Sequence, residues 1–222
     1  MNGNGTAELL LRSELLVDLG PDVVAGLAAA SRRVELGRNE VLFAQDEPAV
    51  EMFMVESGRV AIARRSGDGR SSVVALMEEG DLFGEMPLFD GHGRSADARA
   101  LEPTVLVAVP YQPVRRALEE RPETLWQVVS LLVRRLRVTD EALADTMFLD
   151  VTGRTAKRLL EMAGDRDAFV LPVTQEELAG MVGASRERVN KALATFIRLG
   201  WLRQEDRRYV ITDRLRLGQR AT

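Results

Sequence analysis

The sequence contains no cysteine and only one histidine, His92. Without cysteine the chain has no disulfide, no thiolate metal site, no iron–sulfur ligation and no cysteine nucleophile. A single histidine rules out a multi-histidine metal site, and it makes a histidine-based catalytic triad difficult to build. It lies between Gly91 and Gly93, and we interpret it as a solvated loop residue. Because a Walker-type loop and a nucleophile–base pair are missing too, the sequence predicts neither an enzyme nor a metal protein.

Long hydrophobic runs are also missing. No stretch approaches the roughly 18 apolar residues that a membrane-spanning helix needs. The leucines near the N-terminus are interrupted by Arg12 and Glu14, and no convincing signal peptide is present. We therefore expect a cytoplasmic protein that has no membrane partner.

Charge is distributed unevenly along the 222 residues, whose net charge is −4. Residues 1–150 hold 16 Lys and Arg against 25 Asp and Glu, a net charge of −9. Residues 151–222 hold 14 against 9, a net charge of +5. A basic C-terminal part on an acidic protein suggests a polyanionic partner for that part alone.

The N-terminal half begins with two expected helices, over residues 8–19 and 21–31. Short apolar runs separated by glycine turns follow as far as Pro110, and many short strands at such spacing predict a β-sandwich, jelly roll or barrel. The expected strands lie at 41–44, 52–55, 60–65, 72–77 and 104–109, with one of the turns at Gly67-Asp68-Gly69.

A long helix is predicted from Pro122 to about Leu149. Its apolar residues follow the alternating three- and four-residue spacing of a coiled-coil stripe over roughly four heptads, with Asp140 in the same seam. Pairing with a second copy of the chain is the simpler explanation of so long a stripe; the alternative is a helix packed wholly within its own chain. The apolar stripe residues are Trp126, Val129, Val133, Leu136, Leu143 and Met147.

The segment from Phe83 to Ala96 gathers several groups that suit a small phosphorylated sugar. Gly84 allows close backbone approach, and Arg94 offers a fork of N–H donors for phosphate oxygens. Ser95 adds a hydroxyl, and the backbone N–H groups of Ser95 and Ala96 could face an anion. Glu85, an acceptor when ionised, suits ribose hydroxyls. The alternative is a hairpin loop with a surface Glu85–Arg94 pair.

The basic C-terminal part contains the pattern of a helix-turn-helix between Thr174 and Leu202. Thr174 and Glu177 form a capping box, Gly183 turns the chain, and Ser185 caps the next helix. Two expected strands, at 201–204 and 208–212, would form a wing. Arginine can read guanine, a carboxylate can accept from cytosine, and either Arg or Ser can reach phosphates; the alternative is a helical hairpin with a solvated charged face. The outward residues are Ser185, Arg186, Glu187, Arg188, Asn190 and Lys191, with Lys157, Arg207 and Arg208 as further phosphate candidates.

Three motifs in this order resemble the cyclic AMP receptor protein family, which includes the fumarate and nitrate reduction regulators. They are Phe83-Gly84-Glu85 with Arg94-Ser95-Ala96, the run Phe148–Arg154, and Val182–Glu187. The resemblance extends from about Leu16 to Thr212. It implies an α+β chain in three parts: a cyclic-nucleotide-binding β-roll (jelly roll) with flanking helices over 1–121, a dimerisation helix over 122–149, and a winged helix-turn-helix DNA-binding domain over 150–222, joined by a hinge at Phe148–Arg154.

The resemblance also implies ligands and partners. Arg94 and Ser95, with the backbone of Ser95 and Ala96, would bind the phosphate of cyclic AMP, and Glu85 and Gly84 would bind near its ribose. Thr139 and the next residue would contact adenine. The protein would act as a homodimer on a palindromic operator in double-stranded DNA, with RNA polymerase as a further partner.

Two residues depart from the family pattern. Asp140 stands where cyclic AMP-responsive members commonly carry serine or asparagine, and two such carboxylates facing each other across a dimer would repel. Lys191 stands where many members have a second base-reading arginine, and lysine lacks the bidentate fork. Three alternatives therefore stay open: DNA binding without an effector, another effector such as cyclic GMP, or a regulatory module of an enzyme or channel.

Overall fold

A computed structural model describes residues 3–65, 67, 71–206 and 208–222. The chain divides into two compact units, Met1–Leu136 and Arg137–Thr222, and each is described by itself. The boundary between them falls inside one long helix, α5, so the predicted three-part division stays a prediction. Most of the predicted turn at Gly67-Asp68-Gly69, and the phosphate candidate Arg207, lie outside the described residues.

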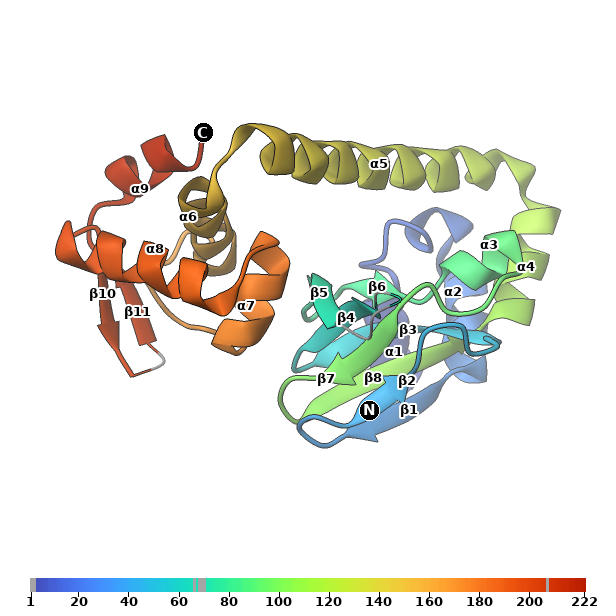
Figure 1. Ribbon diagram of the computed structural model, residues 1–222. Helices are drawn as coiled ribbons and strands as arrows, with labels where there is room; N and C mark the ends of the chain where they lie inside the picture. Colours follow the sequence, from blue (N-terminus) through green and yellow to red (C-terminus); the bar gives the residue numbers. More distant parts are fainter. Residues whose placement is uncertain (1–2, 66, 68–70, 207) are drawn as a thin grey trace. The chain divides into compact units, whose positions relative to one another are not determined.

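The first unit is built on two antiparallel sheets of four strands each, which confirms the predicted β-roll (Figure 1). One sheet has the order β1-β8-β3-β6 and the other β2-β7-β4-β5. The strands of the first sheet are β1 (Arg32–Leu36), β8 (Thr104–Pro110), β3 (Glu51–Ser57) and β6 (Leu82–Phe83). Those of the second are β2 (Val41–Phe43), β7 (Asp97–Ala100), β4 (Val60–Arg65) and β5 (Ser71–Met77).

Strand β3 shows how the sequence forms two cores. Successive side chains of a strand point to opposite faces of its sheet. Phe53 and Val55 pack between the two sheets, whereas Met52 and Met54 pack on the outer face against the helices. All four are buried, which explains the nearly continuous apolar run of this strand. The helices of the unit are α1 (Gly3–Leu10), α2 (Pro21–Ala30), α3 (Met86–Asp90) and α4 (Tyr111–Glu120), with 3₁₀ turns at Val17–Leu19 and Pro122–Thr124.

The expected helix over residues 8–19 is wrong, because α1 ends at Leu10. The hydroxyl of Ser13 accepts a hydrogen bond from the N–H of Leu15, at 3.3 Å, and the Ser13 carbonyl accepts from Val17. Local bonds of this kind give the backbone an alternative to a continuing helix. Helices α3 and α4 and strands β1, β6 and β7 had no separate prediction.

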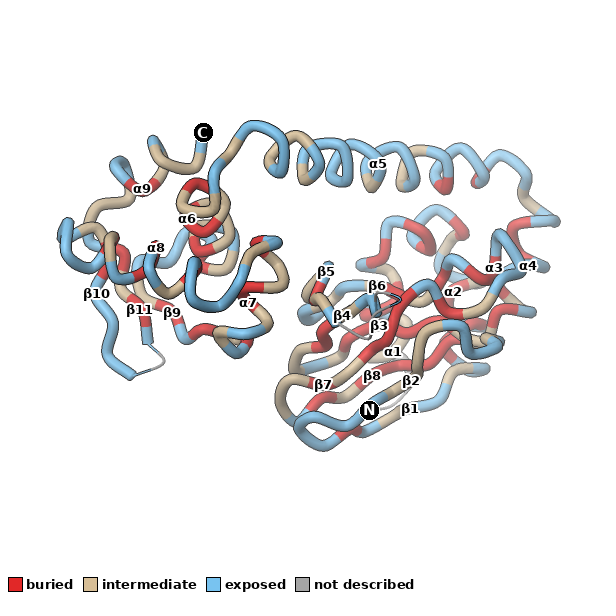
Figure 2. The backbone as a smooth tube through the Cα atoms, viewed as in Figure 1, coloured by how far each residue is buried: buried red, intermediate tan, exposed pale blue. Residues whose placement is uncertain are grey.

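Helix α5 (Leu125–Phe148) confirms the predicted long helix, and most of its length is exposed (Figure 2). In this chain every apolar residue of the predicted stripe is exposed, from 44% for Val133 to 74% for Trp126. Large apolar side chains in a contiguous row on the surface mark an interaction face.

The second unit continues with α6 (Val151–Ala163), β9 (Ala168–Val170), α7 (Gln175–Val182), α8 (Arg186–Arg198), β10 (Leu202–Glu205), β11 (Arg208–Ile211) and α9 (Arg214–Arg220). Thr174 and Glu177 form the predicted capping box on α7. Gly183 follows with a φ of 69°, which glycine adopts without strain, and this turns the chain into α8. Strands β10 and β11 pair antiparallel as the predicted wing, with β9 as the third strand of the sheet. Helix α9 had no prediction.

Candidate nucleotide pocket and DNA-reading helix

The first unit encloses a cavity of about 290 Å³. Its lining includes Arg64 and Arg135, together with the five residues that the sequence analysis grouped together: Gly84, Glu85, Arg94, Ser95 and Ala96. Strand side chains supply apolar lining as well, among them Phe43, Ile62, Ala75 and Met77. An apolar wall with a few convergent polar groups is the usual composition of a small-ligand site.

Arg94 is held at this cavity by the protein itself. Its Nη1 donates to the Gly84 carbonyl at 2.9 Å and to the Tyr111 hydroxyl at 3.1 Å, and its Nη2 donates to the Glu51 carbonyl at 2.8 Å. The guanidinium carbon lies 4.0 Å from the centre of the Phe43 ring, within the range of a cation–π contact. Burial lowers the pKa of Arg94, while Tyr111 and Glu51 oppose the shift. Arg94 therefore organises the cavity wall and is not simply a free donor.

Glu85 is 3% exposed and pairs with Arg135 of α5, which also donates to the Leu82 carbonyl at 3.4 Å. The alternative of a surface Glu85–Arg94 pair is therefore wrong, because both residues are buried and Glu85 takes another partner. The sequence analysis missed Arg135. Its position four residues before Thr139, about one helical turn, was the available signal, since residues four apart share a helix face.

Gly84 is required at its position for two reasons. Its φ of 75° lies in the left-handed region that favours glycine. A Cβ here would lie 2.7 Å from Nη1 of Arg94. The glycine thus allows the guanidinium to lie directly against the backbone of the loop.

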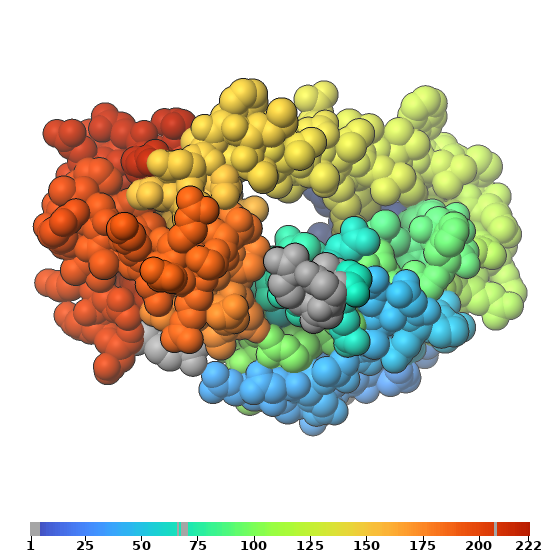
Figure 3. All heavy atoms as spheres, viewed as in Figure 1, coloured from blue at the N-terminus to red at the C-terminus, as the bar shows by residue number. Residues whose placement is uncertain are grey.

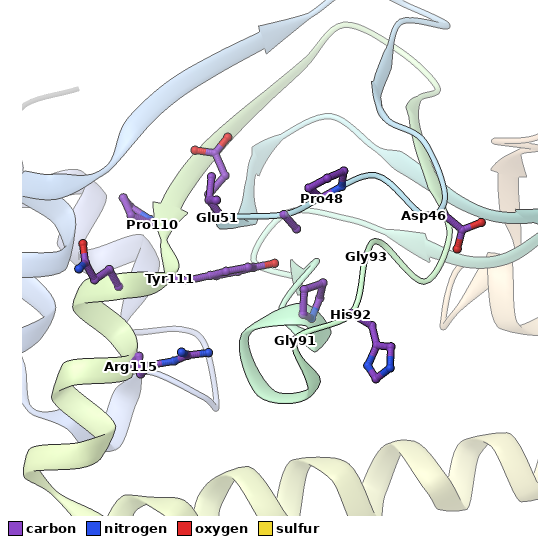
Figure 4. A pocket seen from close by; sticks show the side chains of 13 residues that line it. Asp46, Pro48, Glu51, Gly91, His92, Gly93, Pro110, Tyr111 and Arg115 are labelled. Carbon is purple, nitrogen blue, oxygen red and sulfur yellow. The ribbon is translucent and has the colours of Figure 1, made fainter.

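A second, open hollow of about 830 Å³ lies behind this loop, and Tyr111 extends across it (Figure 4). The Tyr111 hydroxyl donates to the Gly84 carbonyl, so this side chain supports the loop from the opposite side. Burial raises the pKa of Tyr111 to about 12. His92 is exposed at the rim and turned away from Tyr111, in agreement with a solvated loop residue.

Thr139 and Asp140 are exposed on α5 and belong to the second unit. Their roles as adenine contacts stay predictions. Among the described residues, no group of three His, Asp or Glu side chains is placed to hold a metal ion. No helix in the described part of the chain combines the length and hydrophobicity needed to cross a bilayer.

Most of the predicted DNA-reading residues are exposed at the start of α8. The orange atoms of the region around α7 and α8 form part of the surface in Figure 3. Ser185 caps the helix by accepting from the Arg188 N–H at 3.4 Å. Asn190 differs from the others, because it is half-buried and its Oδ1 is buried without a hydrogen-bond partner. The exposed residues are Ser185, Arg186, Glu187, Arg188 and Lys191.

Lys157 is not free for a phosphate. Its ammonium lies 2.9 Å from a carboxylate oxygen of Glu141 and 2.7 Å from one of Asp145, both on α5. These two carboxylates raise the pKa of Lys157 against the opposing effect of burial. The expectation that Lys157 contributes to DNA binding is therefore corrected: it ties α6 to the end of α5.

Comparison with known proteins finds one family match in the N-terminal part of the chain and another in the C-terminal part. A family model described as a cyclic nucleotide-binding domain matches residues 33–121, and one described as a Crp-like helix-turn-helix domain matches residues 153–220. The chain is 39% identical over 221 residues to the "CRP-like cAMP-activated global transcriptional regulator" of Mycobacterium tuberculosis, covering 96% of this chain and 99% of the relative. It is 34% identical over 159 residues to the "cAMP-activated global transcriptional regulator CRP" of Salmonella typhimurium, covering 68% and 76%.

Solved structures agree on the fold. The catabolite activator protein of Thermus thermophilus is 29% identical with a TM-score of 0.53, covering 94% of this chain and 98% of that one. FixK2 of Bradyrhizobium japonicum, at 23% identity, has a TM-score of 0.77 over 86% and 98% and is similar in fold alone. The relatives are transcription regulators, not enzymes. With a cyclic nucleotide-binding domain, a helix-turn-helix and these relatives, the chain belongs to the cyclic AMP receptor protein family of DNA-binding transcription regulators.

Proposed function

We propose that this protein is a homodimeric, cytoplasmic regulator whose binding to a palindromic DNA operator is switched by cyclic AMP. The observation that carries the proposal is the cavity in the first unit, which Arg94, Ser95 and Glu85 line together. Arginine and hydroxyl donors suit the cyclic phosphate, and a carboxylate suits the ribose 2′-hydroxyl. The named relatives from Mycobacterium and Salmonella are both described as cAMP-activated.

Arg135 adds a connection between this cavity and α5. In the structure it neutralises Glu85, the proposed ribose acceptor. A nucleotide brings a 2′-hydroxyl to Glu85 and a phosphate charge that Arg135 can also meet. The ligand therefore changes the partners of a side chain on α5. A ligand can shift a conformational equilibrium only through such differential contacts.

The exposed stripe of α5 supports the proposal of a homodimer. The two α8 helices of such a dimer support the proposal of a palindromic operator. Apolar residues at heptad spacing bury their side chains when two such helices pair. Two recognition helices related by a twofold axis would enter successive major grooves about 34 Å apart, which calls for a palindromic site. RNA polymerase is the proposed further partner at promoters.

Cyclic GMP is a second candidate effector, which Arg64 favours and with which Asp140 is compatible. Arg64 lines the cavity beside the apolar wall, and an arginine can donate to guanine O6 and N7. Asp140 stands where serine or asparagine is common in cyclic AMP-responsive members, and a carboxylate accepts from guanine as well as adenine amino groups.

Calorimetry with cyclic AMP and cyclic GMP tests the proposal, followed by DNA binding with and without the tighter ligand. Ser95→Ala removes one donor to a charged phosphate, worth about 1.5–3 kcal/mol, so we expect nucleotide affinity to fall by about tenfold to more than a hundredfold. Ser72→Ala, on β5 and outside the cavity lining, is the matched control. Equal affinity of Ser95→Ala and wild type would overturn the phosphate assignment. No binding of either nucleotide, together with operator binding by the free protein, would establish effector-independent DNA binding instead.

A further inference from the structure

Helix α9 packs against α6 in the second unit, as the two neighbouring labels in Figure 1 indicate. Arg220, at its end, pairs with Asp150 at the start of α6. Arg214, at its beginning, donates to the Gly164 carbonyl at 2.9 Å and the Arg166 carbonyl at 2.7 Å, just beyond the end of α6. Leu217, between them, is fully buried. Residues at both ends of α9 thus contact residues that flank the two ends of α6.

At the start of α6 the contact is close and specific. Asp150 caps α6 by accepting from the Gly153 N–H at 2.8 Å with Oδ1, and it accepts from Arg220 with Oδ2. The Gly153 bond is the largest cause that lowers the pKa of Asp150, and Arg220 lowers it further, while burial opposes them. A Cβ on Gly153 would lie 2.9 Å from the Arg220 carbonyl oxygen. The backbones of the two helices therefore touch at this point.

The same junction is held from α6 by Arg154. Its Nη1 donates to the Leu149 carbonyl at 2.6 Å, and its Nε donates to the Val182 carbonyl at 2.8 Å. Leu149 is the first residue after α5, and Val182 is the last residue of α7 before the turn into α8. Hydrogen bonds thus connect the end of α5, the start of α6 and the turn before the recognition helix.

We infer that α9 acts as a clamp on the α5–α6 junction, and that Arg220 is a positioning residue for the nucleotide-dependent switching of DNA binding. The inference deepens the proposed function and rests on it. A conformational change that nucleotide binding transmits along α5 reaches α8 through this junction. If the junction is loosened, a smaller part of that conformational change reaches α8. Coupling between two sites requires an element that both of them bias.

The decisive variant is Arg220→Gln in the full chain. It removes the ion pair with Asp150 but keeps the buried Leu217 and the Arg214 contacts. Arg216→Gln, an exposed arginine on the same helix, is the matched control. Asp150→Asn keeps an oxygen that can accept from the Gly153 N–H and loses the charge, so it tests the pair from the other side.

The main readout is the ratio of operator affinities with and without saturating nucleotide. Allosteric factors are typically about 5–150-fold, and we expect the ratio to fall several-fold in Arg220→Gln and in Asp150→Asn, with no further fall in the double variant. Nucleotide affinity without DNA should stay at the wild-type value, since the pocket lies in the other unit. Arg220→Lys should restore part of the ratio. A wild-type ratio in Arg220→Gln would overturn the clamp.

Amide hydrogen exchange supplies a second readout that does not depend on the effector. In nucleotide-free protein, the amides of residues 149–154 should exchange faster in Arg220→Gln than in Arg216→Gln, because local opening loses a stabilising contact. Equal exchange in both variants would overturn the clamp whatever the effector proves to be. A wild-type protein whose DNA affinity ignores both nucleotides would count against the proposed function, whereas this exchange test would still decide on the clamp.

Discussion

Arg94 combines a structural and a ligand-facing position in one side chain. Its three hydrogen bonds join the loop at Gly84 to strand β3 and to the start of α4. A buried guanidinium without hydrogen-bond partners strongly destabilises the folded protein, and so do buried carbonyl groups that have lost their donor. Removing Arg94 would therefore disturb the fold as well as the pocket, and smaller changes around it are the better probes.

Gly84→Ala is such a probe. Its Cβ would lie 2.7 Å from Arg94 Nη1 at a backbone φ of 75°. We expect a loss of about 1–2 kcal/mol in the free energy of unfolding from the left-handed backbone alone, and nucleotide affinity reduced at least tenfold because the guanidinium is displaced. Gly80→Ala is the control, since Gly80 has a φ of 90° with nothing within 4 Å of a Cβ. Calorimetry and chemical denaturation measure both; equal nucleotide affinity in the two variants would contradict the displacement.

The two tyrosines of the chain, Tyr111 and Tyr209, give a pH prediction. Burial raises the pKa of Tyr111 from 10.0 to about 12 and raises that of Tyr209 as well. A group whose pKa is higher in the folded state stabilises the fold below its unfolded pKa, and that contribution is lost as pH rises through the folded pKa. In an ultraviolet titration of native protein we expect Tyr111 not to ionise near pH 10, and Tyr209 to ionise at higher pH than it does in denaturant, where both should ionise near pH 10. A full phenolate step near pH 10 in the native protein would be inconsistent with this burial.

Residue types and spacing were enough to predict five residues that line the cavity together. They did not predict Arg135 or Tyr111 as partners, because each comes from a segment distant in sequence. The direction of the Arg94 hydrogen bonds was also beyond reach, since it depends on the strand β3 carbonyl at Glu51. Lys157 was misjudged for the same reason: its carboxylate partners lie on a different helix.

Among the elements, α5 is notable because every apolar residue of its predicted stripe is exposed. Leu143 is 60% exposed on the stripe, and Val138 is 67% exposed outside it. If the proposed dimer forms through this stripe, we expect Leu143→Asp to be monomeric at micromolar concentration, since a carboxylate in a coiled-coil seam lacks a partner. Val138→Asp should remain dimeric. Light scattering on both variants measures this, and a dimeric Leu143→Asp would show that the stripe is not the dimer contact.

The exposed start of α8 predicts how DNA is read. Arg186→Ala should weaken binding by about 1–3 kcal/mol at one base pair of the operator, because a bidentate contact to guanine is lost. Arg198→Ala, at the far end of the same helix, is the control for general charge. Anisotropy titrations with the operator and with single-base variants measure the difference. An equal loss on random DNA would instead make Arg186 a phosphate contact.

Elements with a strong periodic pattern or a clear cap were predicted well from the sequence, as α5 and the capping box of α7 show. The helix expected over residues 8–19 failed because its apolar pattern continued through Ser13, whose local hydrogen bonds end the regular structure. Helix α9 was missed because it is short and mostly polar, and its helical state depends on Leu217 packing and on Arg214 and Arg220 finding partners on α6.

In the whole molecule, the proposed nucleotide pocket and the proposed operator-binding helix lie in different compact units, so linkage between them is testable in both directions. Saturating operator should tighten nucleotide binding by the same factor by which nucleotide tightens operator binding. Calorimetry of nucleotide with and without operator, beside anisotropy of operator with and without nucleotide, measures the two factors. Factors that differ beyond error would require an additional binding event.

If the exposed apolar stripe of α5 is the proposed dimer contact, the activity of the regulator depends on the concentration of the protein. Any partner that binds only the folded chain adds stability in proportion to the logarithm of its concentration. For a helix that pairs with its own copy, that partner is a second molecule of the same protein. Thermal midpoint should therefore rise with protein concentration, and a cell that makes little of this regulator would hold much of it as separate subunits. Synthesis rate would then set the threshold of the response alongside the effector.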